Sequence, residues 1–189
     1  MTRLIGISGA LRRASFNTAL LNAAIELAPA GVELVAGSIR GIPLYDGDLE
    51  AAEGIPPAAA QLKDQIAAAD GLVLFTPEYN NGIPGVFKNA IDWLSRPATD
   101  IPRVFGGKPV AICGASPGPY GTLISQTAWL PVLRTLQADT WAGGRLAVAR
   151  ANTLMDAQGK LSDEATRTRL AKFIADFAAY VQARQPAQS

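Results

Sequence analysis

The feature that most constrains the fold of this chain is an alternation of short apolar runs with segments of helical periodicity. Runs of strand length occur at residues 4–7, 32–35, 71–75, 109–113 and, less clearly, 145–148. Apolar side chains recur at helical spacing in the segments 16–27, 57–69, 84–95 and 123–136, and in a C-terminal helix capped by Ser162 or Asp163. Such alternation predicts an α/β protein, a three-layer sandwich in which helices cover both faces of a five-stranded parallel sheet.

Length and composition are typical of a single globular domain. The chain has 189 residues, of which 49% are hydrophobic and 17% charged, so global disorder is excluded. We expect one domain over residues 1–184 and a frayed tail at 185–189. No apolar run approaches the roughly 18 residues of a membrane span, and the N-terminus lacks the pattern of a secretion signal. The expected location is therefore cytoplasmic, with no membrane partner.

Charge and reactive residues narrow the function further. The net charge is +1 without a clustered basic stretch, which argues against nucleic acid as a partner. The chain has no histidine and one cysteine, Cys113, which lies in a predicted buried strand. Nucleophile–histidine pairs and common metal sites are therefore absent, so we expect no catalytic side chain and no metal, and a cofactor that carries the chemistry.

A strand–turn–helix unit near the N-terminus has the properties of a phosphate-binding loop. The turn at 8–10 lies between the first strand and the start of a helix, where free N–H groups and the helix dipole favour an anion. Arg12 and Arg13 add positive charge, and Ser15 and Asn17 add short donors. No acidic residue precedes Glu26. The alternative is that Ser15 or Asn17 only caps the helix and that the arginines are solvated.

Two familiar nucleotide motifs do not fit this chain. The turn has only Gly6 and Gly9, in a spacing that differs from the dinucleotide fingerprint. The pair Gly107 and Lys108 is followed by Pro109, which has no N–H to offer a phosphate, so a Walker loop is excluded. A phosphate carrier that is neither ATP nor a dinucleotide becomes attractive, and FMN is one.

Three loops should meet at the carboxyl edge of the sheet, where open α/β sheets bind ligands: residues 8–17, 76–83 and 114–122. The second loop brackets Tyr79 between Pro77 and Gly82, which suits a flat heteroaromatic ring. The third is rich in small residues that permit close approach of a ligand. Either loop, taken alone, could be an ordinary turn, and Glu78 could be a solvent-exposed charge.

The segments 9–17, 77–80 and 86–97 together resemble the NADPH-dependent FMN reductase family. That family includes bacterial quinone, chromate and azo-dye reductases of flavodoxin-like fold, and the resemblance extends over residues 4–136. It implies the strand order 2-1-3-4-5, FMN as cofactor and NADPH or NADH as reductant. The implied flavin-binding residues are Ala10, Leu11, Arg12, Arg13, Ala14, Ser15, Phe16 and Asn17 around the phosphate, Pro77, Glu78, Tyr79 and Asn80 along the isoalloxazine, and Ser116 from the third loop.

Two positions depart from the family pattern. The family commonly has Ser where this chain has Ala10, so one hydroxyl donor to the phosphate is missing. The run 121–126 lacks the arginine that the family usually has there, which affects oligomer contacts or substrate choice more than flavin binding.

The function expected from the residues and the resemblance is an FMN-dependent NAD(P)H oxidoreductase. It would pass a hydride from nicotinamide to flavin and then two electrons to a small-molecule acceptor: a quinone, free flavin, an azo compound or a metal oxyanion. One alternative is a flavodoxin-like electron carrier, although such carriers are usually strongly acidic. Another is a flavin-binding regulatory protein that docks a partner through the loop 43–48.

The helix at 84–95 has bulky residues on more than one side. Phe87, Ile91 and Leu94 suit the sheet, whereas Val86 and Trp93 are expected to point to a second side. A subunit interface would bury that second side, so we predict a homodimer or a dimer of dimers.

Overall fold

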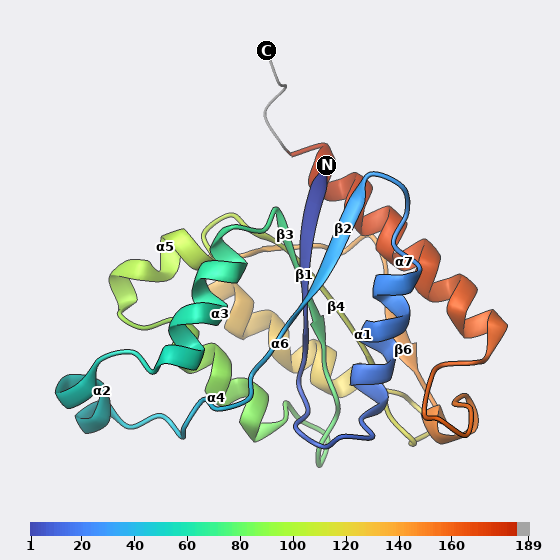
Figure 1. The fold of residues 1–189 in the computed structure, drawn as a ribbon, viewed down its shortest axis with the longest axis horizontal. Helices are drawn as coiled ribbons and strands as arrows, with labels where there is room; N and C mark the ends of the chain where they lie inside the picture. The colour runs from blue at the N-terminus through green and yellow to red at the C-terminus, as the bar shows by residue number, and fades with distance from the viewer. Residues whose placement is uncertain (185–189) are drawn as a thin grey trace.

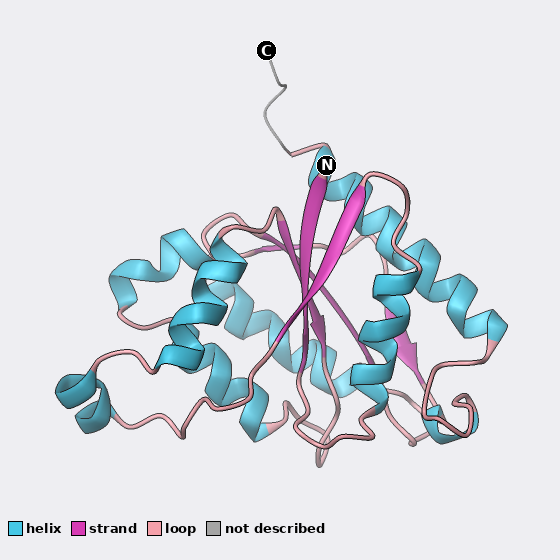
Figure 2. Cartoon of the chain, viewed as in Figure 1, coloured by secondary structure: helices cyan, strands magenta, loops and turns pink. Residues whose placement is uncertain are grey.

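The computed structural model describes residues 1–184, and its sheet is parallel throughout (Figures 1 and 2). The strand order β2-β1-β3-β4-β5 confirms the predicted topology. The strands are β1 (Thr2–Ser8), β2 (Val32–Gly37), β3 (Gly71–Phe75), β4 (Pro109–Ala115), β5 (Asp139–Thr140) and β6 (Leu146–Val148). The tail at 185–189, predicted to be frayed, lies outside the described residues.

The fifth position of the sheet differs from the prediction, because two short strands share it. β5 pairs with the start of β4, and β6, the expected strand, pairs with its end. Between them the chain passes around the ring of Trp141. A Cβ atom on Gly143 or Gly144 would lie 2.4 or 2.7 Å from that ring, so the two glycines permit this detour.

Helices cover both faces of the sheet, as expected from the alternation of strands and helices along the chain. α1 (Phe16–Glu26) and α7 (Glu164–Gln182) pack on one face, where they meet strand residues such as Leu4 and Val73. α3 (Pro57–Ala67), α4 (Gly85–Leu94) and α6 (Leu123–Thr135) pack on the other, against residues such as Ile5 and Leu72. The remaining short elements are α2 (Gly47–Glu53), α5 (Ile101–Val104) and the 3-10 turns η1 (Ala98–Asp100) and η2 (Ala151–Thr153).

The cap of α7 is Asp163, whose carboxylate accepts from Thr166 N at 3.0 Å. Of the two caps that the sequence predicted, Ser162 and Asp163, the structure therefore has Asp163. Its negative charge also interacts favourably with the positive end of the helix dipole.

The structure corrects the prediction for Trp93. This side chain is fully buried, because residues 40–53, here called the strap, cross α4. Its indole Nε1 donates to Pro43 O at 3.0 Å, and the ring of Tyr45 meets it edge-on with centroids 5.0 Å apart. Asn89 holds the strap as well, since its amide pairs with Pro43 O and Tyr45 N. No second subunit is needed to bury Trp93.

The loop 43–48, considered above for partner docking, forms part of the strap and has a structural role inside the chain. Its far end is held by Glu50, whose carboxylate accepts from Arg96 Nε at 2.8 Å and from the Tyr45 hydroxyl at 2.9 Å. The Arg96 guanidinium lowers the pKa of Glu50. Leu44 alone in this loop keeps a largely exposed apolar side chain, at 80%.

Candidate functional site

The first loop leaves β1 and enters α1 with its backbone donors free. Within residues 1–184, the backbone N–H groups from Ala10 to Phe16 have no hydrogen-bond acceptor. None of these residues is a proline, so each has an N–H group to donate. Ser15 is the N-cap, and its Oγ accepts from Asn17 N at 3.2 Å and from Thr18 N at 3.3 Å. The result is a row of unpaired N–H groups at the positive end of a helix, which is an arrangement suited to an anion.

Two arginines flank this loop in different ways. The guanidinium of Arg12 lies 4.8 Å from the centroid of the Phe16 ring. Arg40, at the start of the strap, donates to Leu11 O and so ties the strap to the loop. The sequence analysis missed Arg40, because its partner is a backbone carbonyl 29 residues away.

Asn17 makes a structural contact that the sequence analysis did not predict. Its side chain is 2% exposed, with Nδ2 donating to Ala115 O at 2.8 Å and Oδ1 accepting from Ala115 N at 2.9 Å. Both polar atoms of the amide are therefore engaged with the end of β4. Asn17 links the start of α1 to the third loop.

The second loop makes a tight turn that presents Tyr79. Tyr79 N donates to Gly82 O at 3.2 Å and Gly82 N donates to Tyr79 O at 3.0 Å. Between them Asn80 and Asn81 both have positive φ, of 49° and 58°, as in a type I′ hairpin turn. Asparagine tolerates this conformation better than other side chains do, which explains the pair. The ring of Tyr79 is 46% exposed.

The Glu78 carboxylate is not a free surface charge. Its Oε2 accepts from Ile124 N and Ser125 N, both at 2.9 Å, at the first turn of α6. It thus caps a helix whose own N-cap residue, Thr122, makes no side-chain cap bond. This contact joins the second loop to α6.

Beneath the second loop lies a buried polar network centred on Thr76. The Thr76 hydroxyl donates to Pro77 O at 2.9 Å and accepts from Trp129 Nε1 at 3.0 Å. Ser125 Oγ lies 2.9 Å from the same oxygen. Since Thr76 is fully buried, these bonds hold Pro77 in place from below.

The third loop is held mainly by Ser116, which is 8% exposed. Its Oγ donates to Gly121 O at 2.6 Å and accepts from Gly118 N at 3.3 Å. Its backbone N donates to Val148 O at 3.0 Å, at the end of β6. Ser116 therefore stabilises the conformation of the loop, and its hydroxyl proton is donated to Gly121 O.

The three loops line one cleft, as the topology predicted. It has a volume of about 60 Å³. Its lining consists of Arg12, Ser15, Phe16, Asn17, Pro77, Glu78, Tyr79, Ala115, Ser116 and Pro117. Of the predicted residues, Ala10, Leu11, Arg13, Ala14 and Asn80 are not part of that lining.

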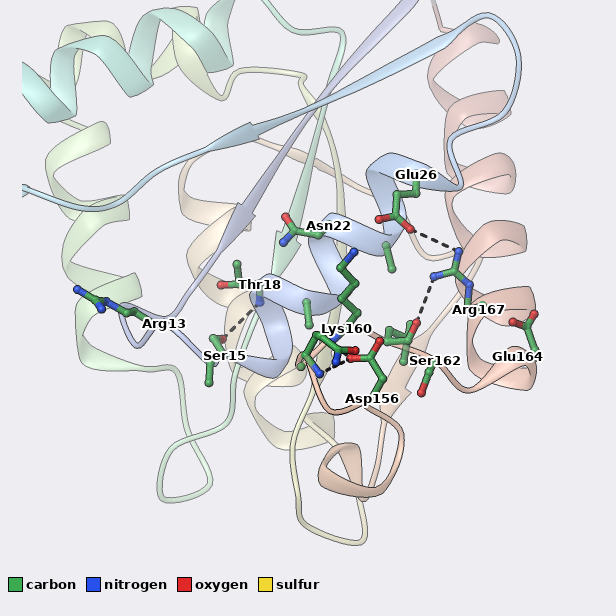
Figure 3. A pocket seen from close by; sticks show the side chains of 16 residues that line it. Arg13, Ser15, Thr18, Asn22, Glu26, Asp156, Lys160, Ser162, Glu164 and Arg167 are labelled. Carbon is green, nitrogen blue, oxygen red and sulfur yellow. Dashed lines mark hydrogen bonds and ion pairs between the residues drawn. The ribbon is translucent and has the colours of Figure 1, made fainter.

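A larger cavity, of about 850 Å³, lies on the outer side of α1 (Figure 3). It shares Arg13, Ala14 and Ser15 with the first loop, but its other wall is the segment before α7. Two of its charges pair within it, since Arg167 lies 3.5 Å from Glu26. Asp156 Oδ1 accepts from two backbone N–H groups of its own turn. Figure 3 shows the Arg13 side chain pointing away from it.

The described residues offer little other chemistry. Cys113 is fully buried, and burial raises the pKa of its thiol, so the chain has no accessible thiolate. Among residues 1–184 no group of three His, Cys, Asp or Glu side chains could hold a metal ion. No helix in this part of the chain combines the length and apolar character that a membrane crossing requires.

A flavodoxin-like sheet with a row of unpaired N–H groups at its first strand–helix turn is typical of proteins that bind phosphorylated ligands at the carboxyl edge of the sheet. The family model for NADPH-dependent FMN reductases matches residues 2–153. The chain therefore belongs to the NADPH-dependent FMN reductase family, and the expected family is confirmed.

Individual proteins agree with this assignment. The chain is 44% identical, over 87% of both chains, to an NAD(P)H-dependent FMN reductase of Pseudomonas aeruginosa. It is 40% identical to a 2-hydroxy-1,4-benzoquinone reductase of a Burkholderia species, over 95% of this chain and 96% of that protein. Its structure matches the flavoenzyme FerB, an NAD(P)H:(acceptor) oxidoreductase of Paracoccus denitrificans, with a TM-score of 0.85 and 30% identity over 97% of this chain and 98% of that chain.

Proposed function

We propose that residues 1–184 form one FMN-binding domain, and that the cleft between the three loops is its flavin site. The observation that carries this proposal is the row of unpaired N–H groups from Ala10 to Phe16 at the start of α1. FMN ends in a phosphate dianion, which such a row accepts. Ala10 needs no hydroxyl in this arrangement, because the backbone supplies the donors.

The side chains divide the work of binding. Arg12 adds positive charge beside the phosphate position, while Ser15 keeps the first turn of α1 in shape. The segment 77–80 forms the wall along the ring and offers backbone N–H groups to its polar edge. Ser116 and Asn17 hold the third loop against the first, so that the wall on both sides of the ring is formed in advance.

Bound FMN would accept a hydride from NAD(P)H and pass two electrons to a quinone, free flavin, an azo compound or a metal oxyanion. The Burkholderia relative is named as a reductase of a benzoquinone, which supports a quinone as the first acceptor to test in an activity assay. The chain's contribution is binding, orientation and electrostatics, and no side chain is assigned a proton transfer. Because the reductant is a cytoplasmic metabolite, a cytoplasmic location is part of the proposal.

Flavin titration tests the site. We expect the apoprotein to bind FMN about 100-fold more tightly than riboflavin, since two charge-assisted hydrogen bonds contribute about 3 kcal/mol. Quenching of flavin fluorescence measures both affinities. Equal affinities would remove the phosphate assignment.

Steady-state kinetics test the reaction. NADPH oxidation should require an acceptor such as a benzoquinone, and initial rates should give parallel lines, because reductant and acceptor take turns at one flavin face. Intersecting lines would indicate a ternary complex. If no small acceptor supports NADPH oxidation, an electron carrier would be favoured, although the net charge of +1 differs from the strong acidity usual in such carriers.

Self-association is also part of the proposal, as a homodimer or a dimer of dimers. Trp93 does not support it, but α6 does: Ile124 and Leu130 are 48% and 46% exposed, and Arg134 is the one charged residue of that helix. Light scattering at micromolar concentration should report at least a dimer, and Leu130→Glu should shift it toward monomer. A monomeric wild-type protein would refute this part.

A further inference from the structure

A third cavity, of about 350 Å³, is lined in part by the third loop. Tyr120 of that loop, Ala147 of β6, Arg145 just before β6 and Arg169 of α7 are among its lining residues. Elements far apart in the sequence thus bring two arginines and an aromatic ring to one place. Its volume falls within the range of small-molecule sites.

The two arginines carry uncompensated charge. Among residues 1–184, neither Arg145 nor Arg169 forms an ion pair or a side-chain hydrogen bond, and no acidic residue lines the cavity. Other arginines of the chain, such as Arg103 and Arg184, do pair with carboxylates. Two guanidinium groups without a carboxylate favour an anion, and their planar forks match phosphate oxygens.

Tyr120 adds an aromatic face. Its side chain is 74% exposed, which makes it one of the most exposed large apolar side chains of the described chain. A purine base stacks readily on such a ring, and stacking of this kind contributes to nucleotide binding without reading the base edges. An anion beside an exposed ring is the chemistry of a nucleotide.

The backbone around the cavity is held in place before any ligand arrives. Arg150 N donates to Gly118 O and Ala151 N donates to Ser116 O, both at 3.0 Å. Gly121 has a φ of +63°, and a Cβ atom there would lie 2.9 Å from the carbonyl carbon of Ala147. The third loop therefore rests directly on β6, which favours binding at low entropic cost.

The position of the cavity connects it to the flavin cleft. Ser116 and Pro117 line the cleft, and Pro119 and Tyr120, in the same loop, line the cavity. A ligand that placed one end at the flavin could cross this short loop and reach the cavity with its other end. A nicotinamide dinucleotide has this form, with a redox ring at one end and adenosine at the other.

We propose that this cavity holds the 2′-phosphoadenosine end of NADPH, with the phosphate between Arg145 and Arg169 and the adenine on Tyr120. The proposal rests on the proposed function, and it makes the enzyme select NADPH over NADH. The larger cavity beside α1 is less suited to a polyanion, because Glu26, Asp156 and Glu164 line it and Arg13 points away (Figure 3).

Calorimetric titration of the FMN-loaded protein with 2′,5′-ADP tests the site apart from turnover, with 5′-AMP as the ligand that lacks the 2′-phosphate. We expect 2′,5′-ADP to bind at least tenfold more tightly than 5′-AMP. Arg145→Ala and Arg169→Ala should each weaken 2′,5′-ADP about tenfold. Lys172→Ala removes a positive charge one turn further along α7 and should change nothing.

Kinetics of the same variants give an independent readout. The KM for NADPH should rise five- to tenfold, whereas kcat and the KM for NADH should stay as in the wild type. Equal binding of the two nucleotides, or 2′,5′-ADP affinity unchanged in both arginine variants, would overturn the proposal. A protein that binds FMN and oxidises NADPH yet gives those results keeps the proposed function, whereas failure to bind FMN removes the proposed function itself.

Discussion

The first and third loops of the site follow strands that end at the same edge of the sheet, yet they use their backbone amides in opposite ways. In the first loop the N–H groups from Ala10 to Phe16 have no partner among the described residues. In the third, Ser116 and Gly118 are both bonded within the protein, and the segment after β6 donates back to them. The start of the third loop is therefore bonded within the protein, whereas the whole row in the first loop requires a ligand or water to satisfy its donors.

Asn17 connects these two loops, so Asn17→Ala should have the largest effect. It would leave Ala115 N–H and C=O buried without partners, which costs about 3 kcal/mol of unfolding free energy. Urea denaturation of the apoprotein measures this loss. Asn22→Ala, on the exposed side of the same helix, is the matched control. Weaker FMN binding with unchanged stability would instead mean that the Asn17 amide is a phosphate ligand.

The second largest effect should come from FMN, which we expect to stabilise the first loop more than the third. At a concentration 100 times the Kd, FMN should add about 2.7 kcal/mol to the unfolding free energy. Hydrogen exchange should show the gain in protection concentrated at residues 10–18, because those N–H groups gain partners. Equal gains at 116–122 would contradict the contrast between a ligand-dependent loop and a preformed one.

Glu78→Gln should cost about 1–2 kcal/mol of unfolding free energy. The substitution removes the negative charge that caps two N–H groups at the start of α6. Glu53→Gln, at an exposed position in α2, controls for loss of a charge. If the two variants unfold at the same denaturant concentration, the link between the second loop and α6 contributes nothing.

Ser15 offers the smallest and most diagnostic change. Ser15→Ala should cost about 1 kcal/mol of stability by removing the N-cap of α1. Ser15→Asp should restore the cap in the apoprotein while repelling the phosphate, so stability and FMN affinity should move in opposite directions. Parallel recovery of both would show that the phosphate does not lie at this turn.

Much of the fold was predictable because its strands are buried on both faces. The segments 71–75 and 109–113 are continuous apolar runs, and they became β3 and the core of β4. β5 was missed because it comprises only Asp139 and Thr140, whose pairing depends on the free edge of β4. The cover over Trp93 was missed because the strap that provides it has no regular periodicity.

The position of the cleft between the three loops was predictable, but the contacts of its side chains were not. Parallel topology brings the three loops together wherever their side chains point. The partner of the Asn17 side chain, however, is a backbone 98 residues away, and the partners of Glu78 are 46 and 47 residues away. A hydrogen bond from a side chain to a distant backbone group leaves no pattern in the sequence. The sequence alone therefore could not distinguish a phosphate-binding role of the Asn17 side chain from a structural one.

By itself, then, the sequence determined the order of strands and helices, the edge where the loops gather, the turn before the first helix and the family, because periodicity, helix starts and local motifs depend on neighbouring residues. Tertiary structure alone decided that Asn17 and Glu78 hold loops together, that the strap rather than a second subunit covers Trp93, and that Arg145 and Arg169 share a cavity with Tyr120. Those outcomes depend on contacts between segments that only the folded sheet brings within hydrogen-bond or packing distance.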